Sequence, residues 1–102
     1  MKLRNDPPQR SATFENKLVL ALLALRTPAE ARAFLRDLCT PAELEAMADR
    51  WAVVEELRRG LPYREIHKKT GVSVTTIGRV ARCLATGAGY EAVAERVAAK
   101  KA

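Results

Sequence analysis

The feature that most limits the fold is an unbroken apolar run, LVLALLAL, at residues 18–25. On a helix this run leaves no polar face over two turns, so it has to be covered on every side. The chain has 102 residues, which is enough for one small domain with a thin core. The simplest cover is a second copy, and we expect a homodimer whose N-terminal helices interlock.

Composition narrows the class of protein. With 48% hydrophobic residues, the chain is too apolar for a disordered protein. The apolar run falls well short of the roughly 20 residues that a membrane helix needs. No signal peptide is recognisable at the N-terminus. Two cysteines, Cys39 and Cys83, are too few for a disulfide framework, and we expect buried thiols in a reducing compartment. The predicted location is cytoplasmic.

The residues that enzymes and metal sites need are scarce. His67 is the single histidine and lies among basic residues, where a surface role is the simpler interpretation. No cysteine and histidine set has zinc spacing, and no glycine-rich phosphate loop is present. The sequence therefore predicts neither an enzyme nor a catalytic residue, metal or cofactor.

Proline and glycine occur almost only where they would punctuate helices, and no segment alternates long enough for a strand. This pattern predicts an all-α fold of about six helices, with a flexible tail at residues 1–12 and a single helical domain at 13–102. We expect a first helix from Phe14 to Leu25, capped by Thr13. Capping signals at Thr27 and Thr40 predict the next two helix starts.

The third helix is expected to be long and to end at Gly60. Its predicted apolar stripe comprises Leu44, Met47, Trp51, Val54 and Leu57. A final amphipathic helix is indicated by Tyr90, Val93 and Val97.

Residues 62–86 fit a helix-turn-helix. Gly71 permits the left-handed backbone of a tight turn, and Ser73 is a good N-cap for the second helix. Ile66 and Val72 are predicted to point inward. Ile77, Val80 and Leu84 lie on one face of the second helix and should also be buried.

The opposite face of that helix suits a DNA major groove about 12 Å wide, because small side chains let the backbone approach the base edges. Arginine side chains further along this helix can reach guanine or phosphate, and basic side chains on the preceding helix can contact phosphates. The predicted DNA-binding residues are Arg64, His67, Lys68, Ser73, Val74, Thr75, Thr76, Gly78, Arg79 and Arg82.

Charge supports this interpretation. The formal net charge is +6, and residues 58–82 contain seven Lys and Arg against one acid, so the entire excess lies in this segment. A concentrated positive charge favours a polyanionic partner, most often nucleic acid. The alternative is a helical dimeric protein-interaction module whose basic surface docks an acidic partner without DNA sequence preference.

Several blocks of the sequence resemble the tryptophan repressor superfamily. They are LCTPAEL at 38–44, ADR at 48–50, EELRRG at 55–60 and the segment from REI at 64–66 to TIGRV at 76–80. The sequences DLCT at 37–40 and RVARCL at 79–84 are closer still to its TrpR-like YerC/YecD branch. The resemblance implies an intertwined homodimer with two helix-turn-helix heads, acting as a repressor on a palindromic operator in double-stranded DNA.

The resemblance also implies a possible effector pocket, formed by Thr40, Arg50, Val54, Arg79, Val80 and Cys83. Arg50 and Arg79 match the two arginines that flank tryptophan in the repressor. Val80, however, stands where the repressor has the glycine that makes room for the indole ring. We therefore expect that tryptophan does not bind and that Val80, with Trp51, fills the space. The sequence also allows a second set of roles for these arginines, in which Arg50 pairs with nearby acids and Arg79 binds DNA.

Overall fold

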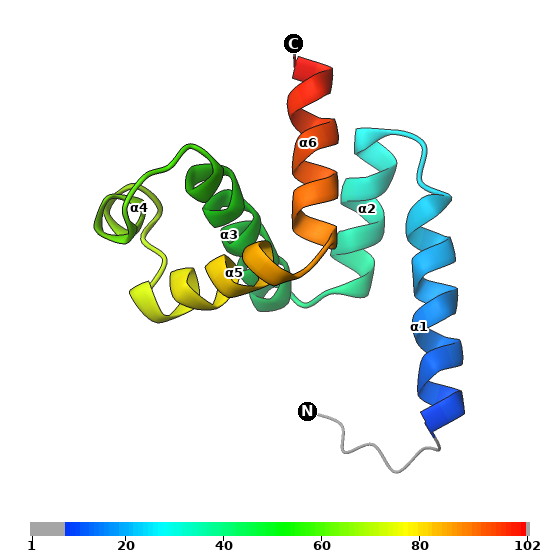
Figure 1. Ribbon diagram of the computed structural model, residues 1–102. Coiled ribbons are helices and arrows are strands. Elements are labelled where there is room, and N and C mark those ends of the chain that lie inside the picture. The colour runs from blue at the N-terminus through cyan, green and yellow to red at the C-terminus, as the bar shows by residue number, and fades with distance from the viewer. Residues whose placement is uncertain (1–7, 102) are drawn as a thin grey trace. The chain divides into compact units, whose positions relative to one another are not determined.

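The computed structural model describes residues 8–101, with side chains for 11–100. In this range the chain is helical and contains no strand, which confirms the all-α prediction. The helices are α1 (Pro8–Leu23), α2 (Pro28–Leu38), α3 (Pro41–Arg58), α4 (Tyr63–Thr70), α5 (Val74–Thr86) and α6 (Gly89–Lys101) (Figure 1). Within the described residues, none of these helices combines the length and apolarity required to cross a membrane.

The start of α1 differs from the prediction. The helix begins at Pro8, so residues 8–12 of the expected tail are helical and Thr13 is not the N-cap. Proline suits a first helical turn, whose N–H groups lack partners within the helix. The helix ends at Leu23 instead of Leu25, and Leu25 N–H donates to the carbonyl of Leu22 in a tighter final turn. Residues 1–7 of the expected tail lie outside the described residues.

The predicted start of α2 is confirmed. The hydroxyl of Thr27 accepts a hydrogen bond from the N–H of Glu30 at 3.1 Å, and Pro28 occupies the first helical turn. The Glu30 carboxylate in turn accepts from the N–H of Arg26 at 3.0 Å. In a capping box the carboxylate accepts from the N–H of the cap residue itself, whereas Glu30 accepts from the residue before the cap.

The chain divides into two units, one ending at Thr40 and the other beginning at Pro41. In the first unit, none of residues 11–40 is buried. The apolar run on α1 is strongly exposed: Leu20 is 66% and Leu23 77% accessible. Burial of such side chains is the main favourable term in folding and association. The apolar run at residues 18–25, which is expected from the sequence to be buried, is therefore accessible to solvent in the first unit.

The second unit contains the core. α3 packs against α4, α5 and α6, and α5 also contacts α4 and α6 (Figure 1). The buried apolar side chains come from all four helices and the α4–α5 turn: Val53, Val54, Ile66, Val72, Ile77, Val80 and Ala94. The inward orientation predicted for the aliphatic side chains of the helix-turn-helix is confirmed, with Leu84 partly buried.

Burial on α3 and α6 is shifted from the predicted stripes. On α3, Val53 is buried beside Val54, whereas Met47 is 41% exposed. On α6, Ala94 is buried while Val93 is 49% exposed. Val53 is buried because α3 contacts three helices and therefore packs on more than one face. Ala94 is buried because its small side chain lets α6 approach its neighbours closely.

The cysteines are more accessible than expected. Cys83 is exposed and Cys39 is half-buried, so the prediction of two buried thiols is wrong. Cys83 directly precedes the core residue Leu84 on α5, and a rotation of about 100° per residue turns it away from the core.

Candidate nucleic-acid interface

The turn between α4 and α5 sets the orientation of the two helices. Gly71 ends α4 in the left-handed region at φ 78°, a conformation that side chains with a Cβ rarely adopt. Its N–H donates to the carbonyl of His67 at 2.8 Å. The turn residue predicted from sequence is therefore confirmed by its backbone geometry.

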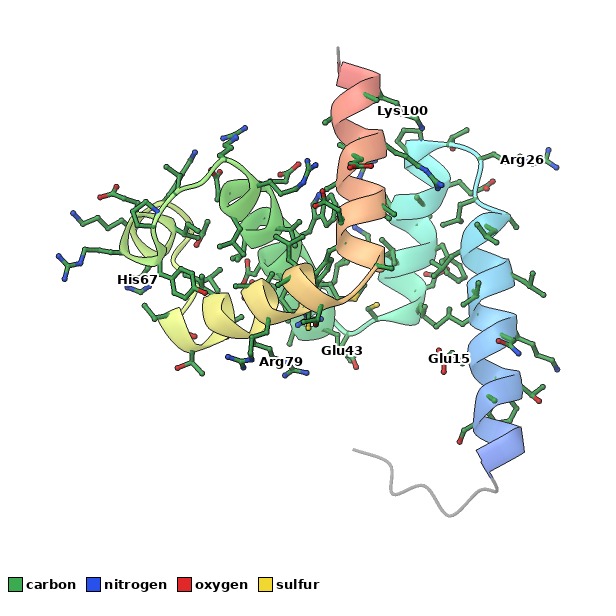
Figure 2. All side chains as sticks on the ribbon, viewed as in Figure 1. Glu15, Arg26, Glu43, His67, Arg79 and Lys100 are labelled. Atoms are coloured by element: carbon green, nitrogen blue, oxygen red, sulfur yellow. The ribbon has the colours of Figure 1, made fainter. Side chains whose placement is uncertain are left out.

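Side chains of α4 reinforce this turn. The Thr70 hydroxyl donates to the carbonyl of Ile66 at 2.7 Å and accepts from the N–H of Val72 at 3.1 Å. Nδ1 of His67 lies 2.7 Å from the carbonyl oxygen of Val72. Because a carbonyl only accepts, Nδ1 must carry the proton of this bond. His67 therefore clamps the turn with one ring nitrogen, while its exposed ring keeps Nε2 for another partner (Figure 2).

Ser73 begins α5 as predicted. Its Oγ accepts from the N–H of Thr76 at 3.2 Å and donates to the Thr76 hydroxyl at 3.0 Å. The cap satisfies one of the free N–H groups of the first turn of α5. Two of the expected DNA contacts, Ser73 and Thr76, thus already hydrogen bond to each other.

The remaining predicted residues of α5 lie on its outer side. Val74, Thr75, Arg79 and Arg82 are exposed, and Gly78 is half-exposed. Arg79 extends from α5 away from the core (Figure 2). On α4, Arg64 and Lys68 are exposed as well. Both helices therefore present their predicted contact residues to solvent.

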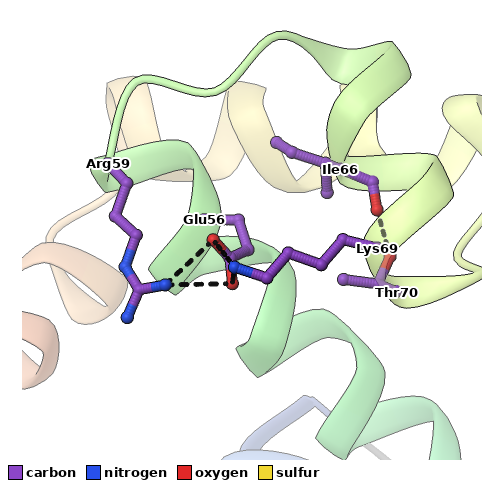
Figure 3. A network of polar contacts seen from close by, with 5 residues as sticks. All are labelled: Glu56, Arg59, Ile66, Lys69 and Thr70. Carbon is purple, nitrogen blue, oxygen red and sulfur yellow. Dashed lines mark hydrogen bonds and ion pairs between the residues drawn. The ribbon is translucent and has the colours of Figure 1, made fainter.

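The structure changes the interpretation of the basic segment, because some of its charges are neutralised internally. The buried Glu56 of α3 accepts from Lys69 Nζ, 3.0 Å from Oε2, and from Arg59 Nη1 at 3.3 Å (Figure 3). The hydrogen bond from Lys69 lowers the pKa of Glu56, and the two positive charges lower it further against partial desolvation, which raises it. Glu56 therefore remains ionised and joins α3 to α4.

A second ion pair neutralises another basic side chain of this segment. Arg58 makes two hydrogen bonds to Glu91 of α6, Nε to Oε1 at 3.1 Å and Nη2 to Oε2 at 3.2 Å. These bonds raise the pKa of Arg58. Neither acid lies within residues 58–82, so the charge count overstated the free positive charge there. Four Lys and Arg residues of segment 58–82 have no ion-pair partner among the described residues: Arg64, Lys68, Arg79 and Arg82.

The residues of the expected effector pocket differ in their environments. Val54 and Val80 are fully buried in the core, whereas Arg79 and Cys83 are exposed and Arg50 is half-buried. Thr40 belongs to the first unit. The Trp51 ring packs against Tyr90 of α6, with ring centroids 6.5 Å apart. These placements put Val80 in the core and Trp51 against α6.

A pocket of about 240 Å³ lies elsewhere, between α3 and α6. It is lined by Trp51, Glu55, Arg58, Arg59, Ala94, Val97 and Ala98, none of which belongs to the expected effector set. Sequence reasoning also missed Glu56 and Glu91. The spacing of Glu56 and Arg59 on one helix was a usable signal, but no local pattern relates Glu56 to Lys69, 13 positions away.

A sequence model of the Trp repressor protein family matches residues 15–98. The chain belongs to the Trp repressor family. This family member is 40% identical over 83 residues to YerC, an uncharacterized protein of Bacillus subtilis strain 168, and the match covers 80% of each chain.

A solved structure supports the same relationship for this Trp repressor family member. The crystal structure of a TrpR like protein from Eubacterium eligens ATCC 27750 superposes with a TM-score of 0.77 at 39% sequence identity. The match covers 81% of this chain and 87% of the other. The all-α TrpR-like fold and the YerC-like branch predicted from sequence are thereby confirmed.

Proposed function

We propose that this protein is a sequence-specific DNA-binding transcriptional regulator that acts as a repressor. One observation carries the proposal. The outer side of α5 combines Thr75 with two arginines that have no ion-pair partner, Arg79 and Arg82, and α5 follows a turn fixed by Gly71 and the Ser73 cap. A regulatory role agrees with membership of the Trp repressor family. The ion pairs support the assignment, because the Lys and Arg residues of segment 58–82 that remain unpaired all lie on the two helices of the helix-turn-helix.

In this proposal α5 enters the major groove. Thr75 offers a hydroxyl to bases and a methyl to thymine, and Arg79 hydrogen bonds to guanine. Arg64 and Lys68 contact phosphates from α4. His67 adds a phosphate contact through Nε2 only in its doubly protonated form, because Nδ1 already donates to the carbonyl of Val72. Phosphate contacts fix the register of a protein on DNA and make its affinity depend on salt.

The proposed unit is a homodimer on a palindromic operator. The uncovered apolar side chains of α1 support this assembly, because a second copy supplies the cover that residues 11–40 lack within one chain. Two α5 helices entering successive major grooves would lie about 34 Å apart. Analytical ultracentrifugation should give a dimer. A monomer at all concentrations would contradict this part of the proposal.

We infer that tryptophan is not the effector. Buried Val80 belongs to the same core cluster as Val54, and an indole ring would need the space that Val80 occupies to be open. The proposed site of action is the cytoplasm, where the DNA is, and no catalytic role is assigned.

Genomic SELEX with purified protein, followed by gel-shift titration of the enriched site, tests the function. We expect a palindromic site bound at least about 1,000-fold more tightly than scrambled duplex. Uniform weak binding to all duplexes would contradict regulation by sequence and support the protein-interaction module instead.

A further inference from the structure

Gly78 is the fifth of the 13 residues of α5, just after the first helical turn. Glycine destabilises an exposed helix interior relative to alanine, because its backbone loses more conformational freedom on folding. The left-handed backbone that would explain a glycine is absent here, since the positive-φ glycines among the described residues are Gly60 and Gly71. Gly78 therefore weakens the helix without serving its backbone conformation.

Packing within the chain does not require the glycine either. A Cβ built at Gly78 would lie 3.7 Å from Nη1 of Arg82 and 3.9 Å from Cε2 of Tyr63. Both distances are ordinary van der Waals contacts, so alanine fits without displacing a neighbour. By comparison, a Cβ at Gly87 would lie 2.8 Å from the carbonyl oxygen of Cys83, where space does matter.

The surroundings of Gly78 face outward. Gly78 is half-exposed, and its neighbours on the helix surface, three residues before and four after, are the exposed Thr75 and Arg82. Tyr63, at the start of α4, is 41% exposed. The Tyr63 ring and the Arg82 guanidinium thus both lie within 4 Å of the position that a Cβ of residue 78 would take. Both residues are exposed, and the Tyr63 hydroxyl and the Arg82 guanidinium can donate hydrogen bonds.

We propose that Gly78 is a specificity-determining residue at which the backbone of α5 makes its closest approach to a base-pair edge. This inference rests on the proposed function and adds to it the point of contact. Close approach of the backbone to a ligand is one of the recurrent uses of glycine in proteins. Here a Cβ that the protein itself accommodates would separate α5 from the bases, while Tyr63 and Arg82 flank the contact.

The test compares Gly78→Ala with wild-type protein on the SELEX-enriched site and on a scrambled duplex of equal length. Gly89→Ala is the matched control, because Gly89 is the first residue of α6 and has no atom within 4 Å of a Cβ built there. We expect Gly78→Ala to weaken binding to the enriched site by about tenfold or more. Binding to scrambled duplex should be unchanged, and the thermal midpoint should rise by roughly 3 °C. Gly89→Ala should bind both duplexes as wild type does.

The outcomes separate this inference from the function on which it rests. An enriched site that Gly78→Ala binds as tightly as wild type would overturn the inference alone. So would an equal loss on both duplexes, which indicates a phosphate contact, or a change in sedimentation, which indicates a subunit contact. Failure of wild-type protein to enrich any site would overturn the proposed function and the base contact together.

Discussion

Nζ of Lys69 lies 3.0 Å from Oε2 of Glu56, and this ion pair connects α4 to α3 beneath the helix-turn-helix. The Glu56 side chain is only 11% exposed, whereas that of Lys69 is 52% exposed. A carboxylate that is largely removed from water depends on its partners for stabilisation. The pair therefore positions α4 and also removes Lys69 from the bases available to DNA.

The first prediction concerns pH. Because its cation partners lower the pKa of Glu56 below the ordinary 4.5, the ionised carboxylate stabilises the folded state. This contribution is complete above about pH 4.5 and is lost as the pH falls through the lower folded-state pKa. Urea unfolding of wild type and Glu56→Gln should differ at pH 7, and the difference should shrink as the pH falls below 4.5. A difference independent of pH would contradict the prediction.

Two adjacent lysines provide a matched test of the free charges. Lys68 has no ion-pair partner among the described residues, so Lys68→Gln should weaken binding to all DNA sequences similarly. It should also reduce the salt slope of log K by about 1. Lys69→Gln should lower stability but leave the salt slope unchanged. The measurements are gel-shift titrations at several salt concentrations and thermal denaturation. Equal salt slopes for the two variants would contradict the assignment.

Arg79 should carry sequence preference as well as charge. Because it extends from the outer side of α5, Arg79→Ala should reduce affinity for the enriched site by about 1–3 kcal/mol. Affinity for scrambled duplex should fall much less. Competition gel shifts measure this difference. Wild-type affinity for the enriched site would refute the proposed contact face.

Ser73 separates helix capping from DNA contact. Ser73→Ala should lower the free energy of unfolding by about 1 kcal/mol, because the N–H of Thr76 loses its acceptor. Ser73→Asp retains a capping oxygen and should keep most of the stability, yet its negative charge should weaken DNA binding. Thermal melts and gel shifts distinguish the effects. Normal DNA binding by the aspartate variant would place this helix end away from phosphates.

The last prediction concerns tryptophan. Isothermal titration of wild-type protein should give no binding heat at micromolar tryptophan, because the Val80 side chain lies fully buried in the core. Binding of micromolar affinity would contradict the proposed absence of a tryptophan effector.

Sequence alone determined the local features of the fold. The starts of α2 and α5 follow from the hydroxyls of Thr27 and Ser73, and the turn follows from Gly71. Each depends on hydrogen bonds or backbone angles within a few residues, which neighbouring residue types reveal. The start of α1 was predicted too late because Thr13 was read as the cap, whereas Pro8, which suits a first helical turn, was not read as a start signal.

Tertiary structure decided which Lys and Arg side chains of segment 58–82 have no ion-pair partner. Glu56 meets Lys69 across 13 positions, and Glu91 meets Arg58 across 33. No periodicity records such pairs, because they form only when separate helices pack and bring oppositely charged side chains within reach. The same packing placed Val53 and Ala94 in the core. The basic segment was visible in the sequence, but the subset of charges open to DNA depends on the three-dimensional arrangement of α3, α4 and α6.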